Sequence, residues 1–483
     1  MQLHISFEGK RDLGGQLYRQ LSEAIRSGRL ADGQQLPPSR LLASQLGLSR
    51  KTVSDVYDRL GYEQLLLGKV GVGSFVQAPP AAPAPRPGGA LLASGERVAR
   101  WEAMERPLVQ GPRSEFARYA FIGGRATPAL FPHDAWRRCV QAALRQERGE
   151  RGNYGPVAGL PVLRTAIAGH AAFTRGIVCT PEQILVTNGA QQALSLLANT
   201  LLEPGDIVVV EEPGYPMARQ LFGAMGAKVV GVEVDGEGML VAQIPDGARL
   251  IYATPTHQFP LGMPMSMARR QALLARAGEL GAVIIEDDYD SAFRYEGRPT
   301  DALQSMDRHG LVAHVGSFSK TMLPELRIGY VVLPAALVRA VQTVKHLTDW
   351  HTPTLTQQAL ARFIEDGHLL RHIRRCHDVY AGRRERLRHW FDGPLSPWFA
   401  LVPTTAGFHV AALLREQVRL DIAQLLRRAR LAEVGLLSIA PFYHGTPRRH
   451  GLYIGYGAID TLDIDAALDI LLGILQEMSP APA

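Results

Sequence analysis

A proline-rich stretch divides this chain and sets the strongest limit on how it can fold. Residues 78–89 read Ala-Pro-Pro-Ala-Ala-Pro-Ala-Pro-Arg-Pro-Gly-Gly. Repeated proline favours an extended polyproline helix and offers little side-chain surface to a core. Such a segment rises ~3.1 Å per residue, so a dozen residues span on the order of 35 Å and let one domain move against another. We therefore predict a domain at 1–77, a linker at 78–115 and a larger domain at 116–483.

The overall composition is that of a globular protein and excludes several classes. The chain has 483 residues, 46% hydrophobic and 20% charged, which is ample material for more than one core. A net charge of +6 permits a polyanionic partner but does not by itself indicate one. No apolar run approaches membrane-spanning length and the N-terminus lacks a signal pattern, so we expect a cytoplasmic protein without a membrane partner. The cysteines stand far apart without metal-ligand spacing, so no disulfide framework and no metal site are expected: Cys139, Cys179 and Cys376.

The first domain reads as helices followed by a hairpin. Apolar residues recur at helical spacing over 15–29, and Ser27-Gly28 closes that helix. Residues 36–47 give a proline-led short helix and a glycine turn, after which Ser49 is placed to cap a further helix. The glycines of 69–76 predict a hairpin that permits close backbone approach. On these patterns alone, a small helical cap decorated by a hairpin is an alternative to a DNA-binding domain.

The helix after Ser49 carries polar residues where a recognition helix presents them. Arg50, Lys51 and Thr52 stand on its first turn, which faces base edges and phosphates in a helix-turn-helix. The apolar positions of the same helix are expected to point inward: Val53, Val56, Tyr57 and Leu60.

The second domain holds a lysine on a turn between two apolar elements. Strand patterns at 311–315 and 326–333 flank the run Gly-Ser-Phe-Ser-Lys-Thr, which places Lys320 on the turn. Partial desolvation and the charge of Arg327 would both disfavour the ammonium form, and condensation with an aldehyde requires a neutral amine. The hydroxyl and guanidinium groups of the same run could hold a phosphate: Ser317, Ser319 and Arg327. A solvated surface turn is the alternative reading of this run alone.

Strands and helices alternate along the rest of the second domain. The patterns predict helices at 190–202 and 267–280, and strands at 184–187, 207–211, 250–253 and 282–286. Such alternation indicates a mostly parallel sheet covered by helices, with ligands bound at the carboxyl ends of the strands. We therefore assign this domain to the α/β class.

Polar side chains follow several of these strands. Residues 188–191 lie between a strand and a helix N-terminus, where free N–H groups attract phosphate, although an ordinary turn explains them equally well. Tyr215 follows the next strand and could lie flat against a planar cofactor or pack in the core. The acidic run 286–290 follows an apolar strand, and a buried carboxylate there needs a cationic partner. A protonated pyridine nitrogen would serve, and a loop that binds a metal or solvent is the alternative.

Residues 1–77 resemble the GntR-type winged helix-turn-helix. They match the patterns L-P-x-S-R-x-L-A, L-G-x-S-R-x-T-V and G-x-G-S-F-V. The resemblance implies operator DNA as a partner, and it places the following residues at the DNA, with Lys51 on a phosphate: Arg40, Ser49, Arg50, Lys51, Thr52 and the wing near Gly73. The run 64–70 departs from the pattern because it is shorter and less charged than the usual approach to the wing.

Residues 116–483 resemble the fold-type I pyridoxal-phosphate (PLP) enzymes, the aspartate aminotransferase class. The lysine run, the acidic run and the strand-end loop at 254–262 carry this resemblance in the expected order. The whole chain resembles the MocR subfamily of GntR regulators. The resemblance implies a winged helix-turn-helix joined to an aminotransferase-like domain, in which a mostly parallel sheet flanked by helices is followed by a smaller C-terminal α+β subdomain.

The resemblance also implies PLP as cofactor and a role for each matching residue. Lys320 would be the catalytic residue and form the internal aldimine. Asp287 would pair with the pyridine nitrogen, Tyr289 would bond the ring hydroxyl, and Tyr215 would stack on the ring. The other cofactor contacts would come from His257 near the ring, from Tyr154 of the partner subunit and from a phosphate-binding set: Ala190, Gln191, Ser317, Ser319 and Arg327.

One position departs from the transaminase pattern. Enzymes of this class hold the substrate carboxylate with an arginine that leads a late strand, and here Tyr453 takes that place. Arg448 or Arg449 could substitute for the arginine, or the ligand could lack a carboxylate.

These observations favour a regulator and leave two other functions open. The leading hypothesis is a transcription factor that senses PLP, or an amine or amino-acid effector, through the aldimine on Lys320. The alternative is an active aminotransferase with an accessory DNA-binding domain, and a third is a PLP-independent repressor with a vestigial second domain. Because fold-type I domains pair across a two-fold axis, the resemblance implies a homodimer with exchanged DNA-binding domains.

Overall fold

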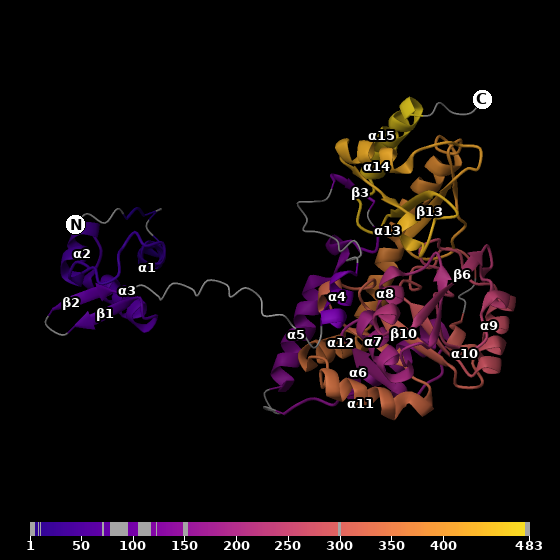
Figure 1. Cartoon of the computed structure of the whole chain (residues 1–483), viewed down its shortest axis with the longest axis horizontal. Coiled ribbons are helices and arrows are strands. Elements are labelled where there is room, and N and C mark those ends of the chain that lie inside the picture. The colour runs from indigo at the N-terminus through magenta and orange to yellow at the C-terminus, as the bar shows by residue number, and fades with distance from the viewer. Residues whose placement is uncertain are drawn as a thin grey trace. The chain divides into compact units, whose positions relative to one another are not determined.

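The computed structural model divides into two compact units, Met1–Ala99 and Arg100–Ala483. Figure 1 labels the helices and strands of both units. The structure describes residues 5–7, 9, 11–69, 72–77, 95–104, 117–121, 123–147, 153–297 and 301–478. The proline-rich stretch 78–89 and most of the expected linker lie outside these ranges. A helix that the sequence analysis did not predict, α4 (Gly95–Glu102), spans the division between the units.

The first unit is a helix-turn-helix with a hairpin. Its elements are α1 (Leu13–Arg26), α2 (Ser39–Leu46), α3 (Arg50–Tyr62), β1 (Leu66–Lys69) and β2 (Gly73–Val76). Gly47 ends α2 in the left-handed region with a φ of 66°, a conformation that glycine adopts without strain. Ser49 caps α3 because its side chain accepts a hydrogen bond from the Thr52 N–H at 3.0 Å. These observations confirm the predicted turn and N-cap.

Apolar side chains at helical spacing hold this unit together. Leu17, Leu21 and Ile25 of α1 are buried, and they belong to one cluster with the inward residues predicted for α3: Val53, Val56, Tyr57 and Leu60. The hairpin is antiparallel, with Leu66 opposite Val76. Its first strand begins at Leu66, earlier than the hairpin start predicted at residue 69, because Leu66 is a buried member of the same cluster.

The second unit is built on a mixed sheet that confirms the predicted α/β class. The strand order is β4-β11-β10-β9-β8-β5-β6-β7. Parallel pairs join β10, β9, β8, β5 and β6, whereas β11 runs antiparallel to both neighbours and β7 runs antiparallel to β6. The bounds are β4 (Ile184–Thr187), β5 (Ile207–Glu212), β6 (Lys228–Asp235), β7 (Gly238–Met239), β8 (Ala248–Ala253), β9 (Val283–Asp288), β10 (Val312–Ser317) and β11 (Gly329–Val332).

Helices cover both faces of this sheet. Alternate strand residues belong to different clusters: Val208 and Val210 pack toward one face with Leu194 of α7, while Val209 packs toward the other with Leu273 of α9. The helices on and around the sheet are α5 (His133–Glu147), α6 (Pro161–Arg175), α7 (Ala190–Leu201), α8 (Pro216–Ala224), α9 (Met267–Leu280), α10 (Leu303–Met306), α11 (Val338–Thr348) and α12 (Thr354–Glu365). Because the middle strands of the sheet are largely buried, polar groups near their carboxyl ends are the ones placed to meet a ligand.

A smaller α+β part completes the second unit and confirms the expected subdomain. Its antiparallel sheet has the order β12-β13-β16-β15. Figure 1 shows it on the yellow and orange side of the second unit, with α13, α14 and α15 around it. The bounds are β3 (Tyr119–Ala120), which pairs with β14 (Val434–Gly435), and α13 (His368–Asp392), β12 (Phe399–Leu401), β13 (His409–Leu414), α14 (Ile422–Leu431), β15 (Leu437–Ser438), β16 (Gly451–Gly455) and α15 (Asp463–Met478).

The predicted strand 326–333 is shorter in the structure than expected. A 3-10 turn occupies Pro324–Leu326, and Arg327 follows it with a φ of 50°. Neither the 3-10 turn nor the left-handed backbone at Arg327 is extended, so the strand begins only at Gly329. In the part of the chain that the structure describes, no helix combines the length and the apolar character needed to cross a membrane.

Candidate functional site

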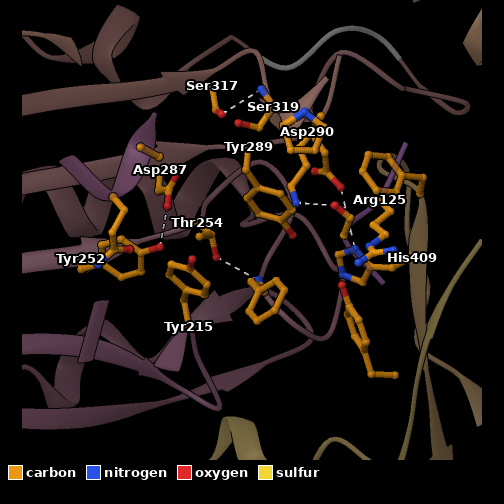
Figure 2. A pocket seen from close by; sticks show the side chains of 18 of the residues that line it. Arg125, Tyr215, Tyr252, Thr254, Asp287, Tyr289, Asp290, Ser317, Ser319 and His409 are labelled. Carbon is orange, nitrogen blue, oxygen red and sulfur yellow. Dashed lines mark hydrogen bonds and ion pairs between the residues drawn. The ribbon is translucent and has the colours of Figure 1, made fainter. Parts of the chain in front are cut away.

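One cavity of the second unit lies where β9, β10 and the turn after β10 meet the smaller subdomain. Its volume is about 270 Å³. Figure 2 shows side chains from both parts of the unit converging on it. The lining includes most of the predicted cofactor residues: Ala190, Gln191, Tyr215, Asp287, Tyr289, Ser317, Ser319, Lys320 and Arg327. The fold therefore gathers residues from five separated segments of the sequence into one site.

Lys320 lies on the turn between β10 and β11, as the sequence predicted. Its Nζ donates a hydrogen bond to the Gly124 carbonyl oxygen at 2.5 Å. Burial lowers the pKa of Lys320, while the carboxylates of Asp290 and Asp287 act in the opposite direction. The expected contribution of Arg327 was wrong: the charges that act on the lysine belong to these two carboxylates, and desolvation alone favours the neutral amine.

Asp287, the residue before the last of β9, carries a buried carboxylate. Its Oδ2 accepts a hydrogen bond from the Tyr252 hydroxyl at 2.7 Å, and its Oδ1 has no partner among the described residues. Burial raises the pKa of Asp287 to about 6, against the lowering effect of the Tyr252 hydrogen bond. An unpartnered buried carboxylate oxygen is costly, so this atom is suited to a cation that enters the cavity.

Two other carboxylates of the acidic run, those of Glu286 and Asp288, have partners away from the cavity. Glu286 accepts hydrogen bonds from the Leu303 and Gln304 N–H groups, and Asp288 pairs with Arg175 at 2.7 Å. Burial by itself raises the pKa of Glu286, but the contact with His314 and these hydrogen bonds hold it down to about 2. Glu286 and Asp288 therefore do not converge with Asp287, whereas Asp290 of the same run lines the cavity beside His409.

The opposite part of the cavity is suited to an anion. Ala190 and Gln191 open α7, whose first N–H groups point out of the helix end, and Gly189 precedes them with a φ of 84°. Arg327 donates to the Asn188 carbonyl oxygen at 2.9 Å, which holds its guanidinium beside the same helix end. Ser317 and Ser319 also line this part, and the Ser319 N–H donates to the Ser317 hydroxyl at 3.2 Å.

Of two further predicted cofactor residues, Tyr289 lines the cavity and His257 does not. The Tyr289 hydroxyl lines the cavity but donates to the His257 carbonyl oxygen at 3.0 Å. His257 itself does not line the cavity, which corrects its assignment as a direct cofactor contact. It lies behind the wall, because its Nδ1 is bonded to Asp290 at 2.8 Å and its ring is 4.4 Å from that of His409.

Tyr154 is outside the cavity of its own chain. Its side chain is exposed, and its ring lies 4.2 Å from the ring of Trp350. The prediction that it reaches the cofactor of a partner subunit therefore stays a prediction.

The late strand β16 explains the departure from the transaminase pattern. Tyr453 lies on β16, is 3% exposed and lines the cavity, so a phenol occupies the wall where the pattern has an arginine. Arg448 and Arg449, considered as substitutes, are both exposed and do not line the cavity. Arg448 instead forms an ion pair with Glu233. The hypothesis that Arg448 or Arg449 takes the place of the late-strand arginine was therefore wrong.

Sequence reasoning missed several residues of the wall. Tyr252 lies near the end of β8 and donates a hydrogen bond to Asp287. The sequence signal that could have identified it is a polar residue near the end of a buried strand. Asp290 and His409 face the cavity and lie 3.8 Å apart, an arrangement that only the fold reveals. Arg125 also lines the cavity, from a segment without helical or strand periodicity.

The residues predicted to contact DNA lie at the starts of α2 and α3 and on the hairpin. The side chains of Arg40, Arg50 and Lys51 are exposed, as a phosphate- or base-contacting surface requires. Thr52 is half-buried, and its hydroxyl lies 2.8 Å from that of Ser49. At Gly73, a φ of 133° strains any other residue, and an added Cβ would lie 2.7 Å from Gln35 Nε2, so that side chain would have to shift. Val70 and Gly71 at the wing tip lie outside the described residues.

Two family models cover both units of the chain. Residues 13–76 match the bacterial regulatory proteins of the gntR family, and residues 130–448 match aminotransferase class I and II. The probable rhizopine catabolism regulatory protein MocR of Rhizobium meliloti is 35% identical over 92% of this chain and 90% of its own length. The chain belongs to the MocR-type GntR regulators.

Other MocR-type relatives and solved aminotransferases agree with this assignment. The pyridoxine biosynthesis regulator PdxR of Corynebacterium glutamicum is 31% identical over 96% of this chain and 95% of its own. The kynurenine aminotransferase of Pyrococcus horikoshii superposes with a TM-score of 0.72 at 26% identity, over 80% of this chain and 99% of the enzyme. The α-aminoadipate aminotransferase LysN of Thermus thermophilus, solved with N-(5'-phosphopyridoxyl)-L-leucine, gives 0.70 at 26% identity, over 79% and 97% of the two chains.

Proposed function

We propose that this MocR-type regulator binds operator DNA through residues 1–77 and controls that binding through PLP held in the cavity of residues 116–483. The single observation that carries the proposal is that two groups line the same cavity. One is the partly desolvated amine of Lys320, and the other is a buried carboxylate oxygen of Asp287 that has no partner among the described residues. The intervening residues 78–115 would serve as the linker.

The donor set of the cavity fits PLP group by group. A pyridinium nitrogen would supply the missing cation at Asp287 Oδ1, and the N-terminus of α7 with Arg327, Ser317 and Ser319 would bind the phosphate. Burial favours the neutral form of the Lys320 amine, and this amine would hold the cofactor covalently. When bound, PLP supplies an aldehyde for amines and a protonated ring that withdraws electrons.

The chain's own residues then have separate tasks. Tyr252 fixes the orientation of the Asp287 carboxylate, which would then face the nitrogen of a bound pyridine ring and favour its protonated form. Tyr215 is partly buried, and desolvation raises the pKa of its phenol to about 12, so the ring would stay neutral as an apolar wall for a planar ligand. The Gly124 carbonyl oxygen accepts a hydrogen bond from the Lys320 amine and so holds the amine in the cavity.

Regulation fits the family better than catalysis does. The relatives that match nearly the whole chain are named as regulators, and the wall lacks the late-strand arginine of the transaminase pattern, replaced by Tyr453. We propose that PLP, or an amine or amino acid that displaces Lys320 from it, is the effector. It changes operator affinity only if it binds more tightly to one arrangement of the two units than to the other.

We further propose a homodimer with exchanged DNA-binding domains, acting in the cytoplasm where an operator is accessible. The support is the family's fold-type I domain and the exposed Tyr154–Trp350 pair, which offers an aromatic surface to a second subunit. Sedimentation of the wild-type chain should give a dimer, and a monomer at micromolar concentration would contradict this part.

The test of cofactor binding uses the purified full-length protein. Incubation with PLP followed by borohydride reduction and peptide mass mapping should place the pyridoxyl group on Lys320. A label on another lysine, or none, would overturn the proposed site.

A further inference from the structure

The turn between β4 and α7, at the proposed phosphate site, is held by a hydrogen-bond network that lies outside the cavity lining. Asn188 stands on this turn. Its N–H donates to Gln192 Oε1 at 2.7 Å, and its carbonyl oxygen accepts from Arg327 at 2.9 Å. Its side-chain Nδ2 donates to Asp349 Oδ2 at 3.0 Å. Three polar groups of one residue are therefore fixed by partners from three different parts of the chain.

Asp349 is the centre of this network. It is the C-cap of α11, and its Oδ2 accepts a hydrogen bond from Asn188 Nδ2 and a second one, at 2.6 Å, from Gln192 Nε2. Gln192 belongs to the first turn of α7, so one carboxylate oxygen joins that turn to the residue that precedes the helix. Asp349 thereby fixes the helix end whose free N–H groups would face a phosphate.

Lys345 holds Asp349 in place from the last turn of α11. Its Nζ donates to both carboxylate oxygens of Asp349, at 2.9 and 3.0 Å, and to Gln192 Oε1 at 3.3 Å. The lysine is 0% exposed, and burial lowers its pKa while Asp349 acts in the opposite direction. A carboxylate beside an anion-binding helix end would repel the anion, so the paired ammonium group also offsets that repulsion.

The packing around the network leaves the turn little freedom to move. Val341 of α11 belongs to one buried cluster with Leu194 and Leu197 of α7, so the two helices are joined by apolar contacts as well. A Cβ added to Gly189 would lie 2.9 Å from Arg327 Nη2, so the turn passes close to the guanidinium. A displacement of the turn would therefore disturb two elements of the proposed phosphate site together, the α7 N-terminus and Arg327.

We propose that Asp349, held by Lys345, is a positioning residue for the phosphate of the bound cofactor. It fixes the turn between β4 and α7 so that the helix N-terminus and Arg327 meet the phosphate together. Neither Asp349 nor Lys345 lines the cavity, so both act through Asn188 and Gln192. The inference rests on the proposed function, and it predicts a loss of affinity that is specific to the phosphate group.

The experiment compares PLP with pyridoxal, which has the same ring and aldehyde but no phosphate. Full-length cofactor-free protein is titrated with each ligand, and binding is followed by the absorption of the bound ligand. The variants are Asp349→Ala, Lys345→Met, the double variant of these two, and Gln192→Ala, which removes contacts of the same network from the α7 side. Asp366→Ala is the matched control, because Asp366 is likewise a helix C-cap that pairs with an arginine four residues earlier, Arg362.

The expected losses concern PLP and spare pyridoxal. Asp349→Ala and Gln192→Ala should each weaken PLP about tenfold and keep pyridoxal within about twofold of the wild type, because the ring and amine contacts remain. Lys345→Met should weaken PLP further, because the remaining carboxylate repels the phosphate. The double variant should lose no more than Lys345→Met, since Lys345 acts through Asp349. Asp366→Ala should match the wild type for both ligands.

The inference and the proposed function fail in different ways. Wild-type PLP affinity in Asp349→Ala and Gln192→Ala would overturn the positioning role, and Gln192→Ala decides the matter if Asp349→Ala does not fold. Equal losses of PLP and pyridoxal would also overturn it, because general damage to the site affects both ligands. A double variant that loses the sum of the single losses would overturn the coupling of Lys345 to Asp349. A wild type that takes up neither PLP nor pyridoxal overturns the proposed function itself.

Discussion

The two functional surfaces of this regulator depend on opposite placements of charge. In the first unit, Arg40, Arg50 and Lys51 are exposed on a small helical scaffold. In the second unit, Asp287 is buried, Lys320 is partly buried, and burial shifts the pKa of both groups. Exposed cations attract a polyanion through a screened field, whereas a buried group such as Asp287 Oδ1, which has no partner among the described residues, favours a small ligand that supplies one. Substitutions in the two units should therefore fail in different ways.

The largest expected effect is the loss of the covalent cofactor site. Lys320→Ala should retain no pyridoxyl label after reduction, because the amine of the cavity is gone, while operator binding without an effector stays within about twofold of the wild type. Mass spectrometry and an anisotropy titration measure the two properties. Lys228→Ala, which changes an exposed lysine of β6, is the control and should label like the wild type. Loss of operator binding in Lys320→Ala would contradict the prediction that substitutions in the two units have separate effects.

The next effect is a pH dependence of stability that originates at Asp287. Its pKa is raised from 3.8 to about 6, so between these values the folded protein holds a proton that the unfolded chain has released. The Asp287 contribution to the free energy of unfolding therefore falls as pH rises from about 4 to about 6, by on the order of 3 kcal/mol.

Urea denaturation of the cofactor-free protein measures this contribution by difference. Asp287→Asn does not titrate, so its stability relative to the wild type should increase between pH 4 and pH 7. Asp246→Asn, at a carboxylate whose side chain is 94% exposed, should show no such trend. Equal pH profiles for wild type and Asp287→Asn would mean that Asp287 is not the buried acid described here.

A smaller effect is expected at the recognition helix. Arg50→Ala should weaken operator binding roughly tenfold and lower the salt dependence of the affinity, because one exposed cation is removed from the DNA surface. Arg29→Ala removes an exposed cation outside α3 and is the control. PLP uptake should be unchanged in both variants. A shift in PLP affinity for Arg50→Ala would contradict the independence of the two surfaces, and unchanged operator affinity would contradict the recognition-helix prediction.

The smallest effect is expected at the wing. Gly73→Ala places a Cβ 2.7 Å from Gln35 Nε2 at a φ of 133°, so the hydrogen bond from that nitrogen to the Val72 carbonyl must shift. We expect a loss of about 1 kcal/mol in the stability of the first unit. Thermal unfolding measures it, and Gly28→Ala, a positive-φ glycine with open space around it, tests whether the clash or only the backbone strain matters.

The parts of the fold that follow from local chemistry could be predicted from the sequence. Strand and helix periodicity located β4, α7 and α9 closely, since long buried elements leave a clear pattern. The Ser49 cap and the Gly47 turn were predicted because each depends on one residue's own hydrogen bond or backbone freedom. The hairpin start and the strand before Gly329 were placed wrongly, because a tertiary cluster and a proline turn decide them.

The site divides in the same manner. Lys320, Asp287 and the α7 N-terminus were found because each follows a strand in a recognisable run. His257 was predicted to contact the cofactor, but it lies behind the cavity wall. Its bond to Asp290 depends on packing between distant segments, which the sequence does not reveal. Arg125 and His409 carry no local signal at all. They enter the cavity only because the smaller subdomain and residues 123–127 close over the sheet.

The most direct test of the account is the operator affinity of the full-length protein, measured by anisotropy on a DNA site selected from a random library by the wild type. The affinity is compared for cofactor-free protein, PLP-loaded protein and PLP-loaded protein with each member of a panel of amino acids and amines. The account predicts that at least one of these additions changes the affinity of the wild type and that Lys320→Ala loses this change. An affinity that is the same under every condition, or a change that persists in Lys320→Ala, would contradict it.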